Sequence, residues 1–325
     1  ASGIIGIAMA FSGFGVWSLV AQQISRQLLN SVFLWVFNKW LPKLIFSWKS
    51  FKEMFDFGWK LLVSGLINTI WTEIYQVVIG KFYQPQTLGQ YTRAQQFSSI
   101  FSSNLTSIIQ RVSYPVLSQL QDDKERLKSG YKRIIKITML VSFVLMLGLA
   151  AIAKPMILVL IGAKWLPAVP FLQILCFNMM LYPLHSINLN MLQVQGRSDL
   201  FLKLEIVKKM IGVLPLCLGI FVNIYYMLIS SVFVGFFSYY LNARYSGPFL
   251  NYSIKEQVKD IIPGFSIALL MALPVYAISY LPLNPFVLLP IQLLAGLLIV
   301  LALCEKIGLE EYKEIKSIVL GLLKK

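Results

Sequence analysis

The chain has 325 residues, of which 57% are hydrophobic and only 13% are charged, whereas soluble domains carry about 25% charged residues. So little polar surface cannot cover a water-soluble globule, which excludes an ordinary soluble enzyme. The net charge of +15 would suit a nucleic-acid-binding protein, but the basic residues are dispersed between apolar segments instead of forming one stripe. Composition therefore predicts an integral membrane protein without a nucleic-acid partner.

Apolar segments long enough to cross a bilayer recur along the whole chain. A helix needs roughly 20 residues to span a hydrocarbon core of about 30 Å, and lipid favours helices because it offers no hydrogen-bond partners to the backbone. The segments, the first of them short, cover residues 4–14, 16–37, 57–80, 94–117, 134–153, 167–191, 206–221, 225–241, 261–281 and 286–304. The predicted fold class is all-α, a polytopic transmembrane bundle of about ten helices.

Basic residues concentrate in every second connection between these segments, and Lys203, Lys208 and Lys209 are assigned to one of the basic connections. The alternate connections hold only Lys81, Arg93, Lys154 and Lys164. By the positive-inside rule the basic connections are cytoplasmic. We therefore expect a multi-pass protein with a cytoplasmic C-terminus.

Acidic residues are distributed even more unevenly than basic ones. All of them fall on the predicted cytoplasmic side except Glu73, which lies within a membrane segment. Transfer or hydrolysis at the outer face usually needs a carboxylate as base, nucleophile or metal ligand. Cys176, Cys217 and Cys304 lie in apolar segments without metal-ligand spacing, and no GxxxxGK[ST] nucleotide-binding sequence occurs. We expect no enzyme activity, no metal and no cofactor.

The second segment carries a polar face. Gln22, Arg26 and Asn30 are spaced at i, i+4 and i+8, which places them on one side of a helix. A charge at bilayer depth is costly and usually faces a cavity or a partner. These residues are predicted to line a cavity, and the alternative is a polar seam between helices.

The segment 94–117 is barely apolar enough to span a membrane. Its polar residues share one face at three- and four-residue steps, with one arginine at each end of that face: Arg93, Gln96, Ser99, Ser103, Ser107, Gln110 and Arg111. Serines alone would be explained by close helix packing. The glutamines and Arg111 favour a water-filled cavity instead.

A second polar stripe in the segment 57–80 includes Asn68, and Glu73 lies beside it. Two roles for Glu73 stay open, a structural ion pair with Arg93 and a carboxylate that couples transport to protons or sodium ions. The lone histidine, His185, has no acidic neighbour in sequence and is interpreted as a satisfied hydrogen-bond donor, in preference to a metal ligand or a proton relay.

Four short runs are similar to a known family. They read GFGVWSLVAQ at 13–22, LGQYTRA at 88–94, PVLS at 115–118 and LIGAKW at 160–165. With them the chain resembles the Wzx-like polysaccharide flippases of the multidrug/oligosaccharidyl-lipid/polysaccharide exporter superfamily. The resemblance extends over essentially the whole chain.

The resemblance implies fourteen helices, in two six-helix lobes plus a final pair, around a cavity that opens alternately to each side. This chain would hold helices five to fourteen, with the first four or so outside it. The expected parts are the last two helices of the first lobe at 1–37, an interfacial amphipathic linker at 38–54, a six-helix lobe at 55–245, the final pair at 260–304 and a cytoplasmic amphipathic tail at 305–325.

The resemblance also implies a substrate, an undecaprenyl-diphosphate-linked oligosaccharide moved to the outer leaflet of a bacterial inner membrane for polysaccharide or O-antigen synthesis. Membrane lipids and polysaccharide polymerase machinery are the implied partners. Serine, asparagine and glutamine suit sugar hydroxyls, and cations suit phosphate. Because a guanidinium can donate two hydrogen bonds to one phosphate, we expect Arg26 and Arg111 to bind the diphosphate.

Three alternatives compete with this interpretation. A drug or cation exporter of the same superfamily would need several acidic residues in its cavity. The predicted segments instead contain one glutamate, Glu73, and two arginines near mid-segment or beside a polar face, Arg26 and Arg111. A membrane glycosyltransferase or ligase is opposed by the acid-free outer connections. A structural scaffold gives no reason for the polar face of the segment 94–117.

The predicted orientation can be tested with two single cysteines, Ser129→Cys and Gln86→Cys, in a background without the three native cysteines. An impermeant thiol reagent added to intact cells should label position 86 and leave position 129 unlabelled, because the first is predicted outside and the second in the cytoplasm. Equal labelling of both would overturn the orientation or the helix count.

Overall fold

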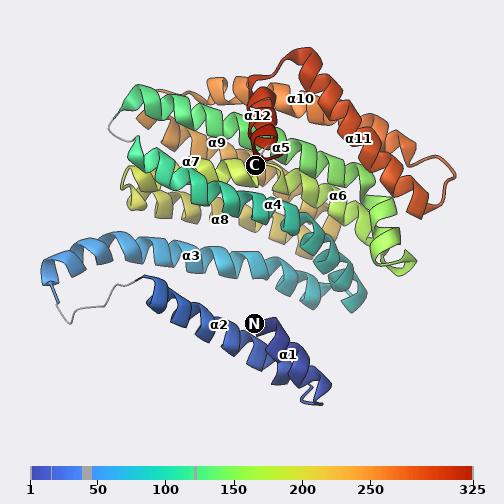
Figure 1. The fold of residues 1–325 in the computed structure, drawn as a ribbon, viewed down its shortest axis with the longest axis horizontal. Coiled ribbons are helices and arrows are strands. Elements are labelled where there is room, and N and C mark those ends of the chain that lie inside the picture. Colours follow the sequence, from blue (N-terminus) through green and yellow to red (C-terminus); the bar gives the residue numbers. More distant parts are fainter. Residues whose placement is uncertain (1, 16, 39–45, 121–122, 324–325) are drawn as a thin grey trace. The chain divides into compact units, whose positions relative to one another are not determined.

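The computed structural model describes residues 2–15, 17–38, 46–120 and 123–323, and the described regular structure is helical (Figure 1). The elements in chain order are α1 (Ser2–Phe11), α2 (Trp17–Phe37), α3 (Trp48–Phe82), α4 (Pro85–Gln119), α5 (Lys124–Leu160), η1 (Ala163–Trp165), α6 (Ala168–Met179), α7 (Tyr182–Val194), α8 (Ser198–Phe221), α9 (Ile224–Ser246), η2 (Gly247–Leu250), α10 (Ile254–Ile278), α11 (Pro285–Ile307) and α12 (Glu310–Leu323). The predicted all-α fold is confirmed.

Six stretches of the described residues are long and apolar enough to cross a membrane. They are α3, α5, α6 with α7, α9 with η2, α10 and α11. The helices α2, α4 and α8 exceed 20 residues but are more polar. Each of the ten predicted segments falls on a helix or, for 167–191, on the α6–α7 pair. The chain is a multi-pass membrane protein.

The chain divides into two compact units, residues 1–53 and 54–325. In the first unit α1 packs against α2, and a Cβ placed on Gly6 would lie 3.0 Å from the Cβ of Gln22. Residues 39–45 of the linker predicted at 38–54 lie outside the described residues, as do Val16 at the start of the second predicted segment and the last two residues of the tail. The end of that linker is continuous with α3, which begins at Trp48.

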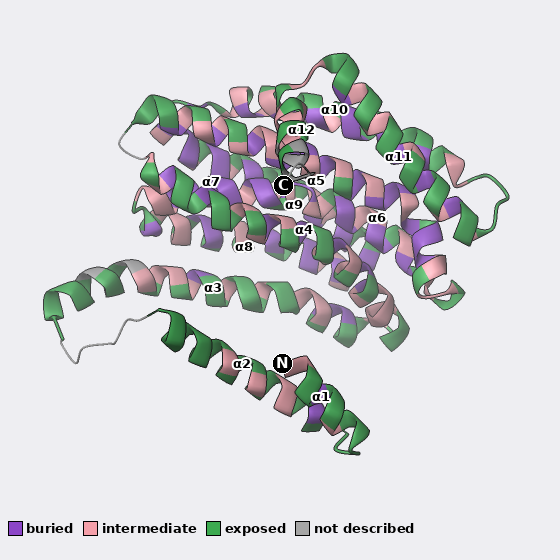
Figure 2. Ribbon diagram, in the orientation of Figure 1, coloured by how far each residue is buried: buried purple, intermediate pink, exposed green. Residues whose placement is uncertain are grey.

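The core of the second unit is built around α5, which packs against α4, α6, α10 and α11. Figure 2 shows buried residues concentrated on α5, α6 and α7, while α3 is largely exposed. The Asp123 side chain accepts a hydrogen bond from the Arg126 amide, 3.1 Å away, and so caps the start of α5. Ser253 and Glu256 form a capping box that starts α10.

The tail helix α12 is attached to α5 by ion pairs. The Nε atom of Arg133 lies 2.7 Å from both carboxylate oxygens of Glu314, and the Nζ atom of Lys136 lies 3.3 Å from Glu311. The Arg133 side chain is exposed, and an exposed ion pair contributes about 0–1 kcal/mol, so the Arg133–Glu314 pair orients α12 more than it stabilises the fold. Its place at a membrane surface stays a prediction.

The close approach of α10 to α5 depends on Gly264. A Cβ at this position would lie 3.2 Å from the Cα of Leu140, which is backbone and cannot rotate away. Gly264→Val should therefore destabilise the protein by about 1–3 kcal/mol through overpacking, measured as a lower thermal unfolding temperature of the purified protein. Gly148→Ala is the control at the same interface, because its Cβ would meet only the flexible end of Met271, 3.5 Å away. Equal effects of the two substitutions would contradict the role given to Gly264.

Candidate functional site: a polar cavity between helices

A cavity of about 960 Å³ lies between α3, α4, α6, α7, α8 and α9. All of its lining residues belong to the second unit. Its polar lining includes Ser64, Asn68, Thr72, Gln95, Thr106, Ser107, Gln110, Arg111, Asn178, His185, Ser186, Asn190, Gln193, Glu205, Lys208, Lys209, Ser231 and Ser238. Aromatic side chains complete the wall, among them Trp71, Tyr75 and Tyr182. The volume is at the upper end of the roughly 300–1,000 Å³ typical of ligand pockets.

The polar residues of α4 have two roles, close helix packing and lining of the cavity. Ser98 and Ser102 are buried, and the Ser102 hydroxyl donates to the Met179 carbonyl at 3.1 Å, as expected of small residues that allow close helix packing. On the neighbouring face, Ser107, Gln110 and Arg111 line the cavity. The Gln110 amide donates to the Ser186 hydroxyl at 2.6 Å. Both alternatives for this helix therefore apply, to different residues.

Three charged residues of α8 form the strongest electrostatic feature of the cavity. Glu205, Lys208 and Lys209, here named the α8 charge cluster, are spaced at three and four residues and so share a helix face. One carboxylate oxygen of Glu205 contacts the Lys208 ammonium, and the other lies 3.7 Å from the Lys209 ammonium. Only 8% of the Glu205 side chain is exposed. The ion pairs within the cluster therefore compensate for the hydration that these charges lose on burial.

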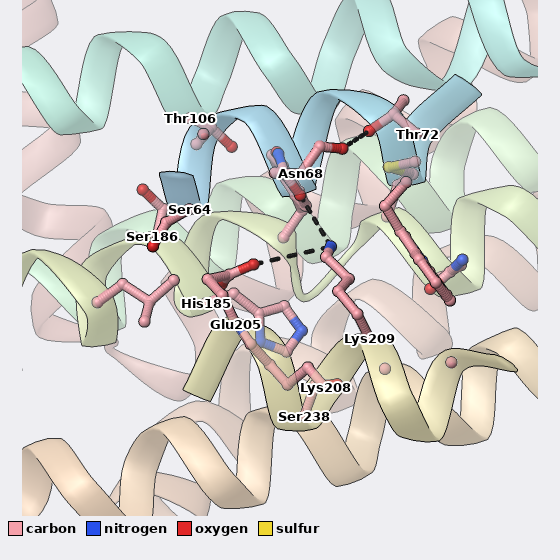
Figure 3. Close-up of a pocket in the computed structure, with 18 of the residues that line it drawn as sticks. Ser64, Asn68, Thr72, Thr106, His185, Ser186, Glu205, Lys208, Lys209 and Ser238 are labelled. Carbon is pink, nitrogen blue, oxygen red and sulfur yellow. Dashed lines mark hydrogen bonds and ion pairs between the residues drawn. The ribbon is translucent and has the colours of Figure 1, made fainter. Parts of the chain in front are cut away.

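Lys209 also joins α8 to α3 (Figure 3). Its ammonium donates to the Asn68 side-chain oxygen at 2.9 Å and lies 5.7 Å from the centre of the Trp71 ring. The Trp71 ring in turn lies against Gly212, where a Cβ would come within 2.6 Å of it. Further along α3, the Gln76 amide donates to Gln95 of α4 at 3.2 Å. The helix α3 is thus held as one wall of the cavity.

His185 lines the cavity from α7. Its Nδ1 atom is 3.2 Å from the side-chain nitrogen of Asn242, and accepts a hydrogen bond when the imidazole is neutral. His185 was predicted to be a hydrogen-bond donor, whereas in this contact the side-chain nitrogen of Asn242 is the donor. Among the residues that the structure describes, no cluster of histidine, cysteine and carboxylate side chains could hold a metal ion.

The structure brings together four of the residues predicted to line a cavity, Asn68, Ser107, Gln110 and Arg111. The lining does not include Gln96 or Ser103. Gln22 packs against Gly6 within the first unit, whereas Arg26 and Asn30 are exposed on α2.

Arg93 and Glu73 also lie outside the cavity lining. The Arg93 guanidinium donates to Gln96 at 2.9 Å and lies 5.3 Å from the centre of the Trp165 ring. Glu73 is exposed on α3, and within the described ranges no ion pair joins it to Arg93. Neither the coupling role of Glu73 nor its ion pair gains support from this geometry.

The α8 charge cluster was missed because its lysines were assigned to a basic connection, although the predicted segment 206–221 already contained Lys208 and Lys209. The helix α8 begins at Ser198, so these residues lie in its third and fourth turns, beside the cavity. A usable signal was present in the sequence, since Glu205 precedes Lys208 and Lys209 by one helical turn. That spacing predicts an ion-paired helix face more specifically than it predicts a connection.

Comparison with known proteins assigns the family. A model of the family described as "Polysaccharide biosynthesis protein" matches residues 1–170, which is more than half of the chain. The chain belongs to this polysaccharide biosynthesis protein family.

Curated relatives match the chain over part of its length. The teichuronic acid biosynthesis protein TuaB of Bacillus subtilis is 32% identical over 59% of this chain and 41% of its own length. The succinoglycan biosynthesis transport protein ExoT of Rhizobium meliloti is 29% identical over 54% and 35%, and the lipopolysaccharide biosynthesis protein WzxC of Escherichia coli is 25% identical over 62% and 42%. The chain thus spans about two-fifths of the length of these relatives.

A solved structure resembles nearly all of the chain. The lipid II flippase MurJ, in an inward closed conformation, covers 97% of this chain with a TM-score of 0.68, and the match covers 66% of MurJ. The two sequences are 16% identical. At that identity the match establishes a shared fold, which agrees with the fold expected from the family resemblance.

The contact between α3 and α8 in this polysaccharide biosynthesis protein can be tested at Gly212. Gly212→Ala should destabilise the protein by about 1–3 kcal/mol because the new methyl group forces the Trp71 ring to move. Gly65→Ala is the control within α3: its Cβ would have open space, so the gain in helix propensity should stabilise by roughly 0.5–1 kcal/mol. Thermal unfolding of both purified variants measures the difference. Opposite signs are expected, and a neutral Gly212→Ala would show that this contact does not position α3.

Proposed function

We propose that the complete protein is a flippase that moves an undecaprenyl-diphosphate-linked oligosaccharide from the cytoplasmic to the outer leaflet of a bacterial inner membrane by alternating access. The observation that carries the proposal is the charge of the cavity. Among the described residues that line it, Arg111, Lys208 and Lys209 are cationic and Glu205 is the one carboxylate. A cavity with excess positive charge at membrane depth suits a ligand that brings negative charge with it.

The rest of the lining suits the sugars of such a substrate. Hydroxyl and amide side chains from several helices surround the cavity, and they can exchange hydrogen bonds with sugar hydroxyls. Trp71, Tyr75 and Tyr182 offer flat apolar surface beside these groups. The lipid tail would stay in the bilayer while the polar part passes through the cavity.

The relatives support the same class of activity. ExoT is named a transport protein, MurJ a lipid II flippase, and TuaB and WzxC are named for teichuronic acid and lipopolysaccharide biosynthesis. In this proposal residues 55–245 form one six-helix lobe, 260–304 form the final helix pair, and 1–37 belong to the other lobe. The basic connections and the C-terminus face the cytoplasm, where polysaccharide polymerase machinery is a candidate partner.

The cation exporter of the same superfamily is the second candidate. It would need a cavity with excess negative charge, because a cationic ligand must replace its water with acidic or carbonyl groups. The described lining has the opposite balance. The glycosyltransferase alternative is disfavoured in the same way, since Glu205 is engaged by two lysines and is not free to act as a base.

Arg111→Gln in the complete protein should lower the transport of lipid-linked oligosaccharide by at least about tenfold at normal abundance. Arg111 lines the cavity with an exposed side chain, and a hydrogen bond to a charged group contributes about 1.5–3 kcal/mol. Lysine should restore part of the rate because the charge survives without the bidentate guanidinium. Arg244→Gln is the matched control, because Arg244 is exposed on α9 and does not line the cavity. The assay measures the lipid-linked oligosaccharide that reaches the far leaflet of vesicles, together with protein abundance.

Arg26→Gln is expected to behave as Arg111→Gln if both arginines bind the same diphosphate. Normal transport by both variants, at normal abundance, would make the two arginines structural and remove them from the proposed site.

A further inference from the structure

Glu205 is the resident counter-ion of the cavity. It pairs with both lysines of the α8 charge cluster, whose side chains are only 11% and 19% exposed for Lys208 and Lys209. Within the described part of the lining there is no second carboxylate to share this task. The Lys209 ammonium is further oriented by Asn68. Two lysines are therefore preorganised around one anion, and in this structure that anion is a side chain.

A substrate phosphate would compete with Glu205 for these lysines. Carboxylate and phosphate oxygens accept the same charge-assisted hydrogen bonds from an ammonium group, and a diphosphate brings more negative charge than one carboxylate. If the diphosphate wins, Glu205 is left buried without its two counter-ions. A buried carboxylate without a counter-ion is costly, and it is neutralised by taking up a proton.

We propose that Glu205 holds the place of a substrate phosphate in the empty cavity, and that a diphosphate group displaces it from Lys208 and Lys209 while Glu205 takes up one proton. This rests on the proposed function, because it assumes that a diphosphate enters the cavity. The exchange is balanced: one O–H bond forms at the Glu205 carboxylate with a proton from cavity water, the hydroxide left behind is neutralised by the buffer, and both lysines keep their protons.

The charged and titratable groups around Glu205 come from several helices. Lys208 and Lys209 are on the same helix, Tyr182 and His185 face the cavity from α7, and Arg111 and Tyr114 face it from α4. The facing residues of α3 include Asn68, Trp71 and Tyr75, and α9 contributes Ser231 and Ser238. His185 also lines the cavity, and its neutral imidazole has a nitrogen that can accept a proton, so an experiment has to separate it from Glu205.

The exchange would make diphosphate binding in the cavity depend on the proton gradient across the membrane. Diphosphate binding and proton uptake would occur together on the cytoplasmic side, and release of both on the outer side. The proton would then move outward with the substrate, so an inward proton gradient would oppose this step and would not drive it. Glu205 meets the requirement for such a site better than Glu73, which is exposed and does not line the cavity. The linkage is reciprocal, so a lower pH should strengthen diphosphate binding to the same degree that binding strengthens protonation.

Calorimetry of inorganic pyrophosphate binding to the purified complete protein tests the proposal. Titrations in two buffers of different ionisation enthalpy give the number of protons taken up. Wild type should take up about one proton more per pyrophosphate than Glu205→Gln, and protons exchanged by the pyrophosphate itself cancel in this difference. Glu205→Gln should also bind roughly tenfold more tightly, because no carboxylate competes for the lysines. Lys209→Gln should bind more weakly than wild type.

Asp199→Asn is the matched control for the loss of a carboxylate. Asp199 lies on the same helix but outside the cavity, and the Arg197 guanidinium that donates hydrogen bonds to it lowers its pKa to about 2. It is therefore ionised at neutral pH, and its replacement removes the same charge. Asp199→Asn should bind pyrophosphate and take up protons as wild type does.

Weaker binding by Glu205→Gln than by wild type, or unchanged proton uptake, would overturn the proposal. The first result would mean that Glu205 positions the lysines, and the second that His185 or another group takes the proton. If Glu205→Gln is not stably folded, Glu205→Asp replaces it; the shorter carboxylate should tighten binding by less and retain proton uptake.

The transport assay separates this proposal from the function on which it rests. A proton difference between wild type and Glu205→Gln, without transport of lipid-linked oligosaccharide, would keep the site and overturn the function. Transport without that proton difference would keep the function and overturn the role of Glu205.

Discussion

A charge in the interior of a membrane protein must be paired or solvated, and the candidate site depends on this constraint. Lys208 and Lys209 are mostly buried on α8, and they are acceptable there because Glu205 lies one helical turn away and a cavity lies in front of them. The same requirement gives Lys209 its contact with Asn68, which positions α3 as a wall of the cavity. The α8 charge cluster and the cavity therefore depend on each other.

The two kinds of contact in the second unit differ in how easily they can rearrange. The helices α5 and α10 meet through close backbone packing at Gly264. This contact can adopt a second arrangement only if the surrounding core repacks. The helix α3 buries the apolar Val78 and Ile79 near its end, whereas its middle is held by Asn68 and by the ring of Trp71. Segments held by few polar contacts move at lower cost than core helices. An exchange of anions at Lys209 would thus act on a part of the fold that is able to respond.

Hydropathy was sufficient to predict the all-α fold, since each apolar segment lies on a helix or, for 167–191, on the α6–α7 pair. It did not predict where a helix begins: α5 starts at Lys124, ten residues before the apolar run at 134, and α3 starts at Trp48. For α4 the polar face was predicted from the sequence, but only the structure shows which residues of that face line the cavity. Ser103 and Ser107 are one turn apart, yet only Ser107 lines the cavity. Periodicity places residues on one helix face and does not say how far along the helix that face meets a cavity.

The α8 charge cluster shows why topology signals can hide a binding site. A lysine that only orients a helix needs water or lipid phosphate around it, as Lys203 has on the exposed side of α8. Such a lysine has no use for a buried acidic partner, because burying the pair costs several kcal/mol that the pairing must recover. Lys208 and Lys209 do share a buried acid, so orientation alone does not account for them. Because a buried salt bridge is weak evidence for stability, we attribute this ion pair in the cavity wall to a ligand that replaces one of its members.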